Sequence, residues 1–434
     1  MERLYWNNDW KFAETWEEAM KEAVYPENEM EDVRLPHTCK ELPYHYFDEH
    51  AYQMLCGYRR HFMAPEAWQG KSVELTFEGV AHDAVVYVNG TEVKAHHCGY
   101  TAFSVELAKY LKYGEDNVLA VRVDSRENLN IPPFGYAIDY MTFGGIYREV
   151  YVQVRNKTHL ADVFIKPQIH PLQVTTEITV QNISDGITLQ QEIRKKGEGA
   201  YSPLGQKPVQ QTNMQTVFPV QEIRLWEPEN PYLYEIRTSL WKNGEMIDAR
   251  VDITGFREAG FRKDGFYLNG KKLRLRGLNR HQSYPYVGYA APASMQIFDA
   301  DILKKELGVN AVRTSHYPQS QDFIRRCDEI GLLVFTEFPG WQHIGGEEWK
   351  RQAMQNLKEM IVQYRNHPSI ILWGVRINES QDDDVFYRET NRVAHELDDT
   401  RATGGVRMLK KSHLLEDVYT FSVCLHEGRQ PGGN

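Results

Sequence analysis

Hydrophobic and polar residues alternate along much of residues 1–155, the pattern of half-buried strands. Segments 73–77 and 118–123 alternate in this way, and the apolar run 84–88 is followed directly by Asn89-Gly90. An Asn-Gly pair after a strand-like run is a strong hairpin signal, because both residues tolerate a positive φ. The spacing of these strands predicts a β-sandwich over residues 1–155.

The same strand-like pattern continues over residues 156–256. Segments 177–181 and 234–240 alternate, Asn243-Gly244 marks a second hairpin, and 226–231 is a Pro-rich loop between strands. About 100 residues of short alternating strands are typical of an immunoglobulin-like module. We therefore predict a second, immunoglobulin-like β-sandwich here.

From residue 257 onward the periodicity changes. One more hairpin, 266–271, is followed by helical patterns over 295–307, 320–330 and 349–365, and the first two end at Gly308 and Gly331. Alternation of strands and helices predicts a parallel sheet with right-handed crossovers. The predicted strands lie near 273–277, 310–314, 332–337, 370–377, 402–406 and 418–421.

A complete (β/α)₈ barrel takes eight strands and about 250 residues. Residues 257–434 provide room for six of them, so the barrel is expected to be about two βα units short. The predicted fold class is multi-domain β plus α/β, with domains at 1–155, 156–256 and 257–434.

Polar side chains stand where the predicted barrel strands end. In chain order they are His281, Arg313, His316, Glu337, Asn378 and Glu379. The carboxyl ends of parallel barrel strands meet at one face, which is where barrel enzymes build their active sites. The pattern therefore predicts a catalytic site at this end of the barrel.

Glu379 is the best candidate for a general acid/base, because a partly desolvated carboxyl at a barrel mouth can protonate a leaving oxygen. Asn378 beside it is suited to a substrate hydroxyl. The alternative is that Asn378-Glu379 caps the following helix, which starts with Gln381 and three aspartates.

The other candidates also have structural alternatives. Arg313 can hold a carboxylate in a bidentate contact, and Glu337 is either that partner, which we favour, or a second catalytic acid. His316 and His281 either bind a sugar hydroxyl or are satisfied structural histidines. A metal site built from the two histidines lacks a specific ligand spacing, so no metal is predicted. Asp139 either reaches a cleft or occupies a turn.

Composition excludes several functions. The formal charge is −10 with no long basic run, which argues against a nucleic-acid partner. No apolar run approaches the ~18 residues of a membrane span, and the N-terminus lacks a signal-peptide pattern. Motifs for dinucleotide binding, phosphoryl transfer and serine hydrolysis are absent, so no cofactor is expected.

Two residue types add to this picture. The five cysteines, Cys39, Cys56, Cys98, Cys327 and Cys424, are scattered, so we interpret them as free thiols of a cytoplasmic protein. Aromatic residues make up 12% of the chain, which is consistent with carbohydrate binding although most of them are expected in sandwich cores.

Several motifs together resemble the family 2 glycoside hydrolases, which contain β-galactosidases and β-glucuronidases. The matching segments, in order, are Leu35-Pro36-His37-Thr38, 77–80, 86–90, 99–103, Gly144 to Arg148, Gly277 to His281, Arg313 to Pro318, and Asn378-Glu379. The resemblance runs through nearly the whole chain. It implies a jelly-roll sugar-binding domain, an immunoglobulin-like domain and a TIM barrel.

The resemblance also implies roles. Glu379 matches the acid/base, Asn378 the contact to the sugar 2-hydroxyl, and Arg313 the arginine that orients the nucleophile. The remaining matches are His281 and His316 in the substrate pocket, Asp139 in a first-domain loop that reaches the sugar, and Glu337 as a barrel carboxylate. The family retains anomeric configuration, which requires a second carboxylate ~5–5.5 Å from the first.

The sequence departs from the family pattern in three places. The nucleophilic glutamate belongs on a seventh barrel strand, and Glu427 in loop-like sequence is no substitute, so no nucleophile is assigned. Ser422-Val423-Cys424 stands where an Asn-Asp-Phe-like continuation is expected. The stretch from Trp373 to Asn378 is one residue longer than in well-known members, which predicts a bulge before Asn378.

The expected function is a retaining exo-β-glycosidase, foremost a β-galactosidase, with little or no turnover by this chain because the nucleophile is missing. The alternatives are a β-glucuronidase or β-galacturonidase, a non-catalytic carbohydrate-binding protein, and a degenerate fragment. The expected partner is a carbohydrate, a β-galactoside or a β-glucuronide. Membership of a family with many oligomers leaves a homo-oligomer open.

Overall fold

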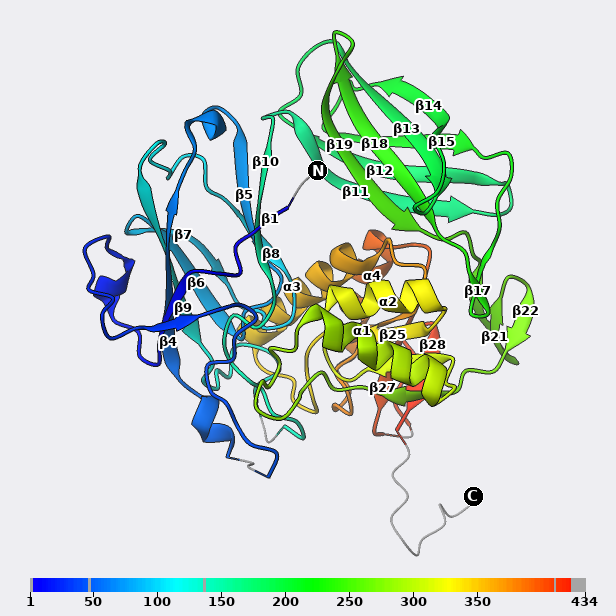
Figure 1. Ribbon diagram of the computed structural model, residues 1–434. Coiled ribbons are helices and arrows are strands. Elements are labelled where there is room, and N and C mark those ends of the chain that lie inside the picture. The colour runs from blue at the N-terminus through cyan, green and yellow to red at the C-terminus, as the bar shows by residue number, and fades with distance from the viewer. Residues whose placement is uncertain (1–2, 46–47, 136–137, 410, 423–434) are drawn as a thin grey trace, which may run out of the picture.

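The computed structural model describes residues 3–45, 48–135, 138–409 and 411–422. Figure 1 shows two β-sandwiches, one in blue to cyan and one in green, beside a body of helices around a parallel sheet in yellow to red. Among the described residues, no helix combines the length and the apolar character needed to cross a membrane. Cys39, Cys56, Cys98 and Cys327 are buried free thiols, and Cys424 lies outside the described residues.

The first sandwich packs a six-stranded sheet against a four-stranded sheet. The larger sheet has the order β3 (Glu31–Val33), β2 (Trp10–Ala13), β4 (Leu55–Met63), β9 (Asp116–Asp124), β6 (Asp83–Val88), β7 (Thr91–His96). The smaller has the order β1 (Leu4–Tyr5), β10 (Val150–Arg155), β5 (Ser72–Phe77), β8 (Phe103–Glu106). Short 3₁₀ turns lie at Glu18–Lys21, Glu49–Tyr52 and Glu66–Trp68. Asn89 and Gly90 form the predicted hairpin turn with φ of 50° and 84°.

The second sandwich pairs a three-stranded sheet with a four-stranded sheet. Their orders are β11 (His159–Gln168), β12 (Gln173–Gln181), β15 (Asn213–Pro219) and β14 (Ser202–Pro208), β13 (Ile187–Lys195), β18 (Tyr234–Lys242), β19 (Glu245–Thr254). Segments 177–181 and 234–240 lie in β12 and β18, as predicted, and Asn243-Gly244 turns the chain between β18 and β19.

Two small antiparallel units join this sandwich to the barrel. Within 226–231, predicted as a loop, β16 (Trp226–Glu227) pairs with β17 (Asn230–Pro231). A three-stranded hairpin sheet follows, with β20 (Ala259–Arg262), β21 (Gly265–Leu268) and β22 (Lys271–Leu273). Trp226 is fully buried and clusters with Leu268 and Leu333, so it ties the linker to the barrel.

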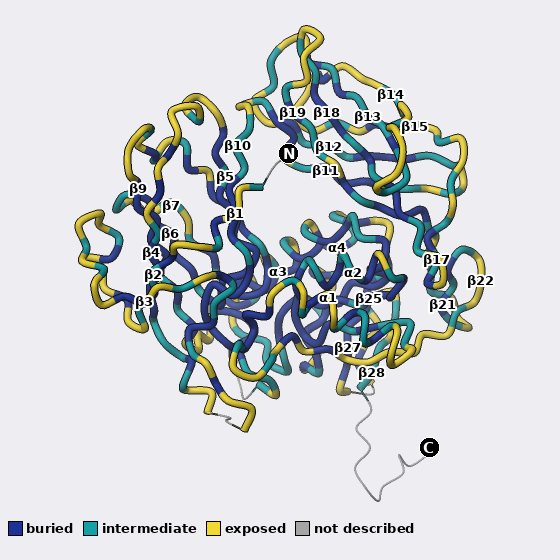
Figure 2. The backbone as a smooth tube through the Cα atoms, viewed as in Figure 1, coloured by how far each residue is buried: buried dark blue, intermediate teal, exposed yellow. Residues whose placement is uncertain are grey.

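The barrel consists of parallel strands in sequential order, β23 (Gly277–Asn279), β24 (Ala311–Thr314), β25 (Leu333–Glu337), β26 (Ile370–Gly374), β27 (Ala402–Arg407) and β28 (Val418–Phe421). Its helices are α1 (Ala293–Asp301), which continues into a π-helical turn (Ile302–Glu306), α2 (Gln321–Ile330), α3 (Glu347–Tyr364) and α4 (Asp384–Leu397). β23 and β28 are not paired with each other, so the described part of the barrel is an open, incomplete one. Figure 2 shows β25 almost entirely buried, whereas β22, at the edge of the hairpin sheet, is mostly exposed.

Two predicted strand limits are wrong. The first barrel strand is 277–279 rather than 273–277, because residues 271–273 complete the antiparallel hairpin sheet. β26 ends at Gly374 rather than 377. Arg376 is 1% exposed, lies 4.3 Å from the Tyr387 ring centre and pairs with Asp382, so residues 375–377 leave the ladder.

The predicted bulge is also displaced. Val334 pairs with Ile370 and Phe335 with Leu372, so the register shift falls at Ile371, inside the strand. The helix-cap interpretation of Asn378-Glu379 is wrong as well, because Asp383 caps α4 by accepting a hydrogen bond from the Phe386 amide.

Candidate active site

The end of β24 and the end of β25 meet in a buried ion pair. Arg313 Nε donates to Glu337 Oε1 at 2.9 Å and its Nη2 donates to Oε2 at 2.7 Å. The same Nη2 donates to Asn378 Oδ1 at 2.7 Å. The predicted partnership of Arg313 with Glu337 is therefore present, and Asn378 is joined to it.

Glu337 is 1% exposed, so its charge depends on these contacts. Burial raises the pKa of Glu337, but the charge of Arg313 and its hydrogen bonds to the carboxylate hold that pKa below the usual range. Gly374 on β26 makes room for this side chain, since a Cβ there would lie 2.3 Å from Glu337 Cγ. Glu337 is thus ionised and held in place.

Two histidines lie beside this pair. His316 is buried, with Nδ1 2.9 Å from Arg313 Nη2 and 3.4 Å from Glu337 Oε2. His281 follows β23, and its Nδ1 lies 3.1 Å from the hydroxyl of Tyr317. The two imidazole rings are 5.8 Å apart and nearly perpendicular. Burial, helped by His316 and Arg313, lowers the pKa of His281 to about 4, so this ring is neutral near pH 7.

Glu379 adopts a left-handed backbone conformation, with φ of 53°, which few non-glycine residues adopt. Its amide donates to Val406 O at 2.9 Å, and Asn378 O accepts from the Gln342 amide at 2.8 Å. These two bonds fix the Asn378-Glu379 turn between β27 and the loop after β25. The half-buried Glu379 carboxylate has no hydrogen-bond partner within the described ranges, which leaves it available for a ligand.

A loop of the first sandwich reaches this site. Asp139 lies in this loop, and partial burial of its carboxyl together with the nearby charge of Glu379 raises its pKa. Tyr140 packs its ring 5.2 Å from that of His281 and 6.1 Å from that of His316. The loop therefore adds an acid and an aromatic wall to the barrel mouth.

Several hydrogen bonds pin the first sandwich to the barrel around the site. Trp349 Nε1 on α3 donates to Phe134 O at 3.0 Å, and Tyr289 donates to Met141 O at 2.7 Å. Arg148, 5% exposed, reaches from the first sandwich into the barrel, where its Nη2 donates to Gln282 Oε1 at 3.1 Å and Pro318 O at 3.0 Å. The loop with Asp139 is held at both ends.

The structure thus brings His281, Arg313, His316, Glu337, Asn378, Glu379 and Asp139 to one place. Tyr140 and Gln342 were not found from the sequence. The only sequence signal for Tyr140 is its position next to the candidate Asp139. Gln342 contributes its backbone amide, and no side-chain pattern predicts such a contact.

A second group of carboxylates lies elsewhere. Glu78, Glu149 and Asp322 approach one another closely enough to hold a cation, where the first sandwich meets α2. Glu78 already pairs with Arg3 at 3.3 Å. These residues do not belong to the barrel mouth.

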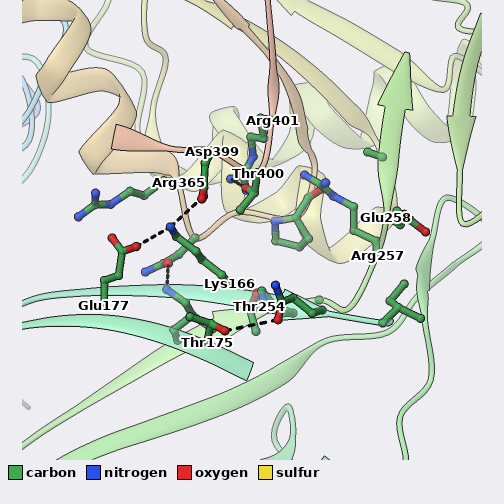
Figure 3. A pocket seen from close by; sticks show the side chains of 18 of the residues that line it. Lys166, Thr175, Glu177, Thr254, Arg257, Glu258, Arg365, Asp399, Thr400 and Arg401 are labelled. Atoms are coloured by element: carbon green, nitrogen blue, oxygen red, sulfur yellow. Dashed lines mark hydrogen bonds and ion pairs between the residues drawn. The ribbon is translucent and has the colours of Figure 1, made fainter. Parts of the chain in front are cut away.

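The cavity in Figure 3 lies at the opposite end of the barrel. Its wall includes residues 365–368 and 399–401, which precede β26 and β27, together with strands of the immunoglobulin-like sandwich. Lys166 bridges the two parts, pairing with Glu177 at 2.5 Å and Asp399 at 2.8 Å. Because barrel chemistry occurs at the carboxyl ends of strands, we do not take this cavity for the active site.

Comparison with known proteins gives a consistent answer. Family models described as "Glycosyl hydrolases family 2" match residues 158–257, with the family's sugar binding domain matching 32–155 and its TIM barrel domain 260–422. A β-galactosidase of Thermoanaerobacter pseudethanolicus is 48% identical over 96% of this chain and 57% of its own length. A β-glucuronidase of Bacteroides fragilis is 32% identical over 79% of this chain and 53% of its own.

A solved structure, Bacteroides uniformis β-glucuronidase 2 covalently bound to cyclophellitol-6-carboxylate aziridine, superposes with a TM-score of 0.87. It is 29% identical and covers 97% of this chain and 55% of that chain. The chain therefore spans somewhat more than half the length of these relatives. With three consecutive domain models of one family and these relatives, the chain belongs to glycosyl hydrolases family 2.

Proposed function

We propose that this chain supplies the sugar pocket and the general acid/base of a retaining exo-β-glycosidase that acts on terminal β-galactosides. The observation that carries the proposal is the Glu379 carboxylate, which has no hydrogen-bond partner among the described residues and is held beside the Arg313–Glu337 ion pair. In the proposed reaction Glu379 protonates the glycosidic oxygen as the bond to C1 breaks, and later takes a proton from the attacking water.

The pocket residues have distinct proposed tasks. Asn378, His281, His316 and Asp139 hold the sugar hydroxyls. Arg313 and Glu337 neutralise each other, so they orient Asn378 rather than react. The covalent step of a retaining mechanism needs a second carboxylate. Glu337 is not free to supply it, because both of its carboxylate oxygens accept hydrogen bonds from Arg313.

Galactose is favoured over a uronic acid by two observations. The β-galactosidase relative shares 48% identity with this chain, against 32% for the β-glucuronidase. A uronate also needs a cation for its carboxylate, and Arg313 is already paired with Glu337. The β-glucuronidase proposal rests on the close superposition with the Bacteroides uniformis enzyme.

A hybrid protein separates these proposals. Residues 1–422 are joined to the part of the Thermoanaerobacter relative that follows the matched region, and hydrolysis of aryl β-galactoside and aryl β-glucuronide is compared. We expect the galactoside to be cleaved faster and the unmodified chain to show little turnover. Preference for the glucuronide would refute the galactosidase proposal. Appreciable hydrolysis by residues 1–434, abolished by Glu379→Gln, would refute the expected inactivity.

A purely sugar-binding role is tested on the unmodified chain by calorimetry with galactose and glucuronate. Heat of binding without hydrolysis by the hybrid protein would favour that alternative. No heat at millimolar sugar would remove it.

A further inference from the structure

The hydroxyl of Tyr317 has a defined hydrogen-bond direction. It lies 3.3 Å from the amide nitrogen of Gln282 and 3.1 Å from Nδ1 of His281. A backbone amide only donates, so the Tyr317 oxygen accepts from Gln282, and the Tyr317 proton can be donated to Nδ1 of His281. In that arrangement Nδ1 of His281 is the unprotonated, accepting nitrogen.

Arg313 imposes the same state on His316. Two groups lie close to Nδ1 of His316. The Nη2 atom of Arg313 is 2.9 Å away, and the Oε2 atom of Glu337 is 3.4 Å away. Because a guanidinium has no acceptor, the nearer contact requires Nδ1 to accept. The two hydrogens of Nη2 thus face three acceptors, Glu337 Oε2, His316 Nδ1 and Asn378 Oδ1.

Asn378 is oriented by the same logic. Its Oδ1 lies 2.7 Å from Arg313 Nη2, so the carboxamide oxygen faces the guanidinium and the NH₂ group is directed elsewhere. Three side chains around the mouth therefore have their acceptor atom occupied by the protein and their donor atom left over.

From these contacts we propose that Tyr317 and Arg313 act as positioning residues that lock His281 and His316 as Nε2–H tautomers. With Asn378, the histidines then form an array of hydrogen-bond donors that recognises the hydroxyl oxygens of a sugar. The inference deepens the proposed function and rests on it for the identity of the ligand. Asp139 supplies a complementary acceptor for a sugar hydroxyl proton.

The tautomer of His281 matters because its ring is neutral. A doubly protonated ring would donate from both nitrogens and need no positioning partner. With a pKa of about 4, His281 carries one proton near pH 7, and its location decides whether the ring donates or accepts toward the pocket. A ring that is protonated at Nε2 and accepts a hydrogen bond at Nδ1 has no free lone pair for a metal ion.

The test is imidazole NMR on residues 1–434 labelled with ¹⁵N-histidine, at pH 7 and without sugar. His281→Gln and His316→Gln assign the two rings. We expect each ring to show a protonated Nε2 and an unprotonated Nδ1. A proton on Nδ1 of His281 or of His316 would overturn the proposal, whatever the behaviour of any variant.

Tyr317→Phe sharpens the test. We expect His281 to lose its single tautomer, with both nitrogen shifts moving toward the averaged values of an exchanging ring, while His316 stays unchanged. Tyr100→Phe is the matched control: Tyr100 stacks on Tyr317 at 4.4 Å, and within the described residues no hydrogen bond joins its hydroxyl to His281 or His316. This control should leave both histidines as in the wild type.

Unchanged His281 shifts in a folded Tyr317→Phe protein would remove Tyr317 from the proposal. If that variant does not fold, the wild-type assignment still decides. Because the readout needs no substrate, failure of the hybrid protein to hydrolyse a galactoside would leave the tautomer result standing.

Discussion

The two ends of the barrel sheet both carry clusters of charged side chains, but they use charge differently. At the mouth, Glu337 is 1% exposed and bound on both oxygens, while nearby Glu379 has no partner within the described ranges. At the base, Lys166 pairs with Glu177 and Asp399, whose side chains are 45% and 67% exposed. Hydrated ion pairs join two domains at the base, whereas at the mouth a fixed Arg313–Glu337 pair lies beside Glu379, a carboxylate without a partner in the described part of the chain.

Glu379→Gln in the hybrid protein should have the largest effect on this comparison. Loss of the acid/base is expected to lower kcat/KM on aryl β-galactosides by about 10²–10⁴-fold, because proton transfer to the leaving oxygen is lost. Initial rates measure this. Glu396→Gln, on the exposed face of α4, is the control and should leave the rate unchanged. Equal rates for Glu379→Gln and wild type would show that the free acid is not the catalytic one.

Arg313→Met should be the most destabilising change at the mouth. It leaves Glu337 buried without its counter-charge, which costs about 3–5 kcal/mol of unfolding free energy. Urea unfolding measures the loss. Arg392→Met, which removes exposed pairs on α4, should cost no more than about 0.5 kcal/mol. Similar losses for the two variants would contradict the contrast between enclosed and hydrated charge.

Neutral His281 should make stability depend on pH. Its pKa is lowered to about 4 in the folded protein, against about 6.5 in an unfolded chain. Between these values the unfolded state binds more protons, so stability falls as the pH drops from about 6.5 toward 4. His281→Gln should reduce this slope, as followed by thermal unfolding across the range. His170→Gln, in an exposed turn, should leave the slope unaltered.

Lys166→Met should have the smallest effect. Both carboxylates that it pairs with stay hydrated after the change, so the expected loss is about 0–1 kcal/mol. Urea unfolding again provides the number, and galactoside hydrolysis by the hybrid protein should be unchanged. A loss as large as that of Arg313→Met would erase the distinction between the two ends.

Much of this arrangement is predictable from the sequence. Strand periodicity located β5, β6, β9, β12 and β18, and the polar residues at strand ends located the mouth, because parallel strands bring their carboxyl ends together. The domain limits at 155 and 256 and the roles of the site residues stay predictions.

What sequence patterns missed depends on contacts between distant segments. Residues 271–273 look like a barrel strand, yet their backbone groups are used by the β21 hairpin. An apolar run to Ile377 looks like one strand, but buried Arg376 turns it away from the ladder after Gly374. Neither competing partner is visible in the local pattern. Glu427 and Cys424 lie outside the described residues, so the predictions about them stay open.

Arg148 bears on how such proteins can recombine. It belongs to the first sandwich, yet two of its hydrogen-bond acceptors, Gln282 and Pro318, belong to the barrel, on the far side of the immunoglobulin-like module in the chain. A gene crossover in that module would separate Arg148 from the barrel with which it was selected. A first sandwich taken from a relative must therefore supply an arginine at this position to keep both hydrogen bonds to the barrel.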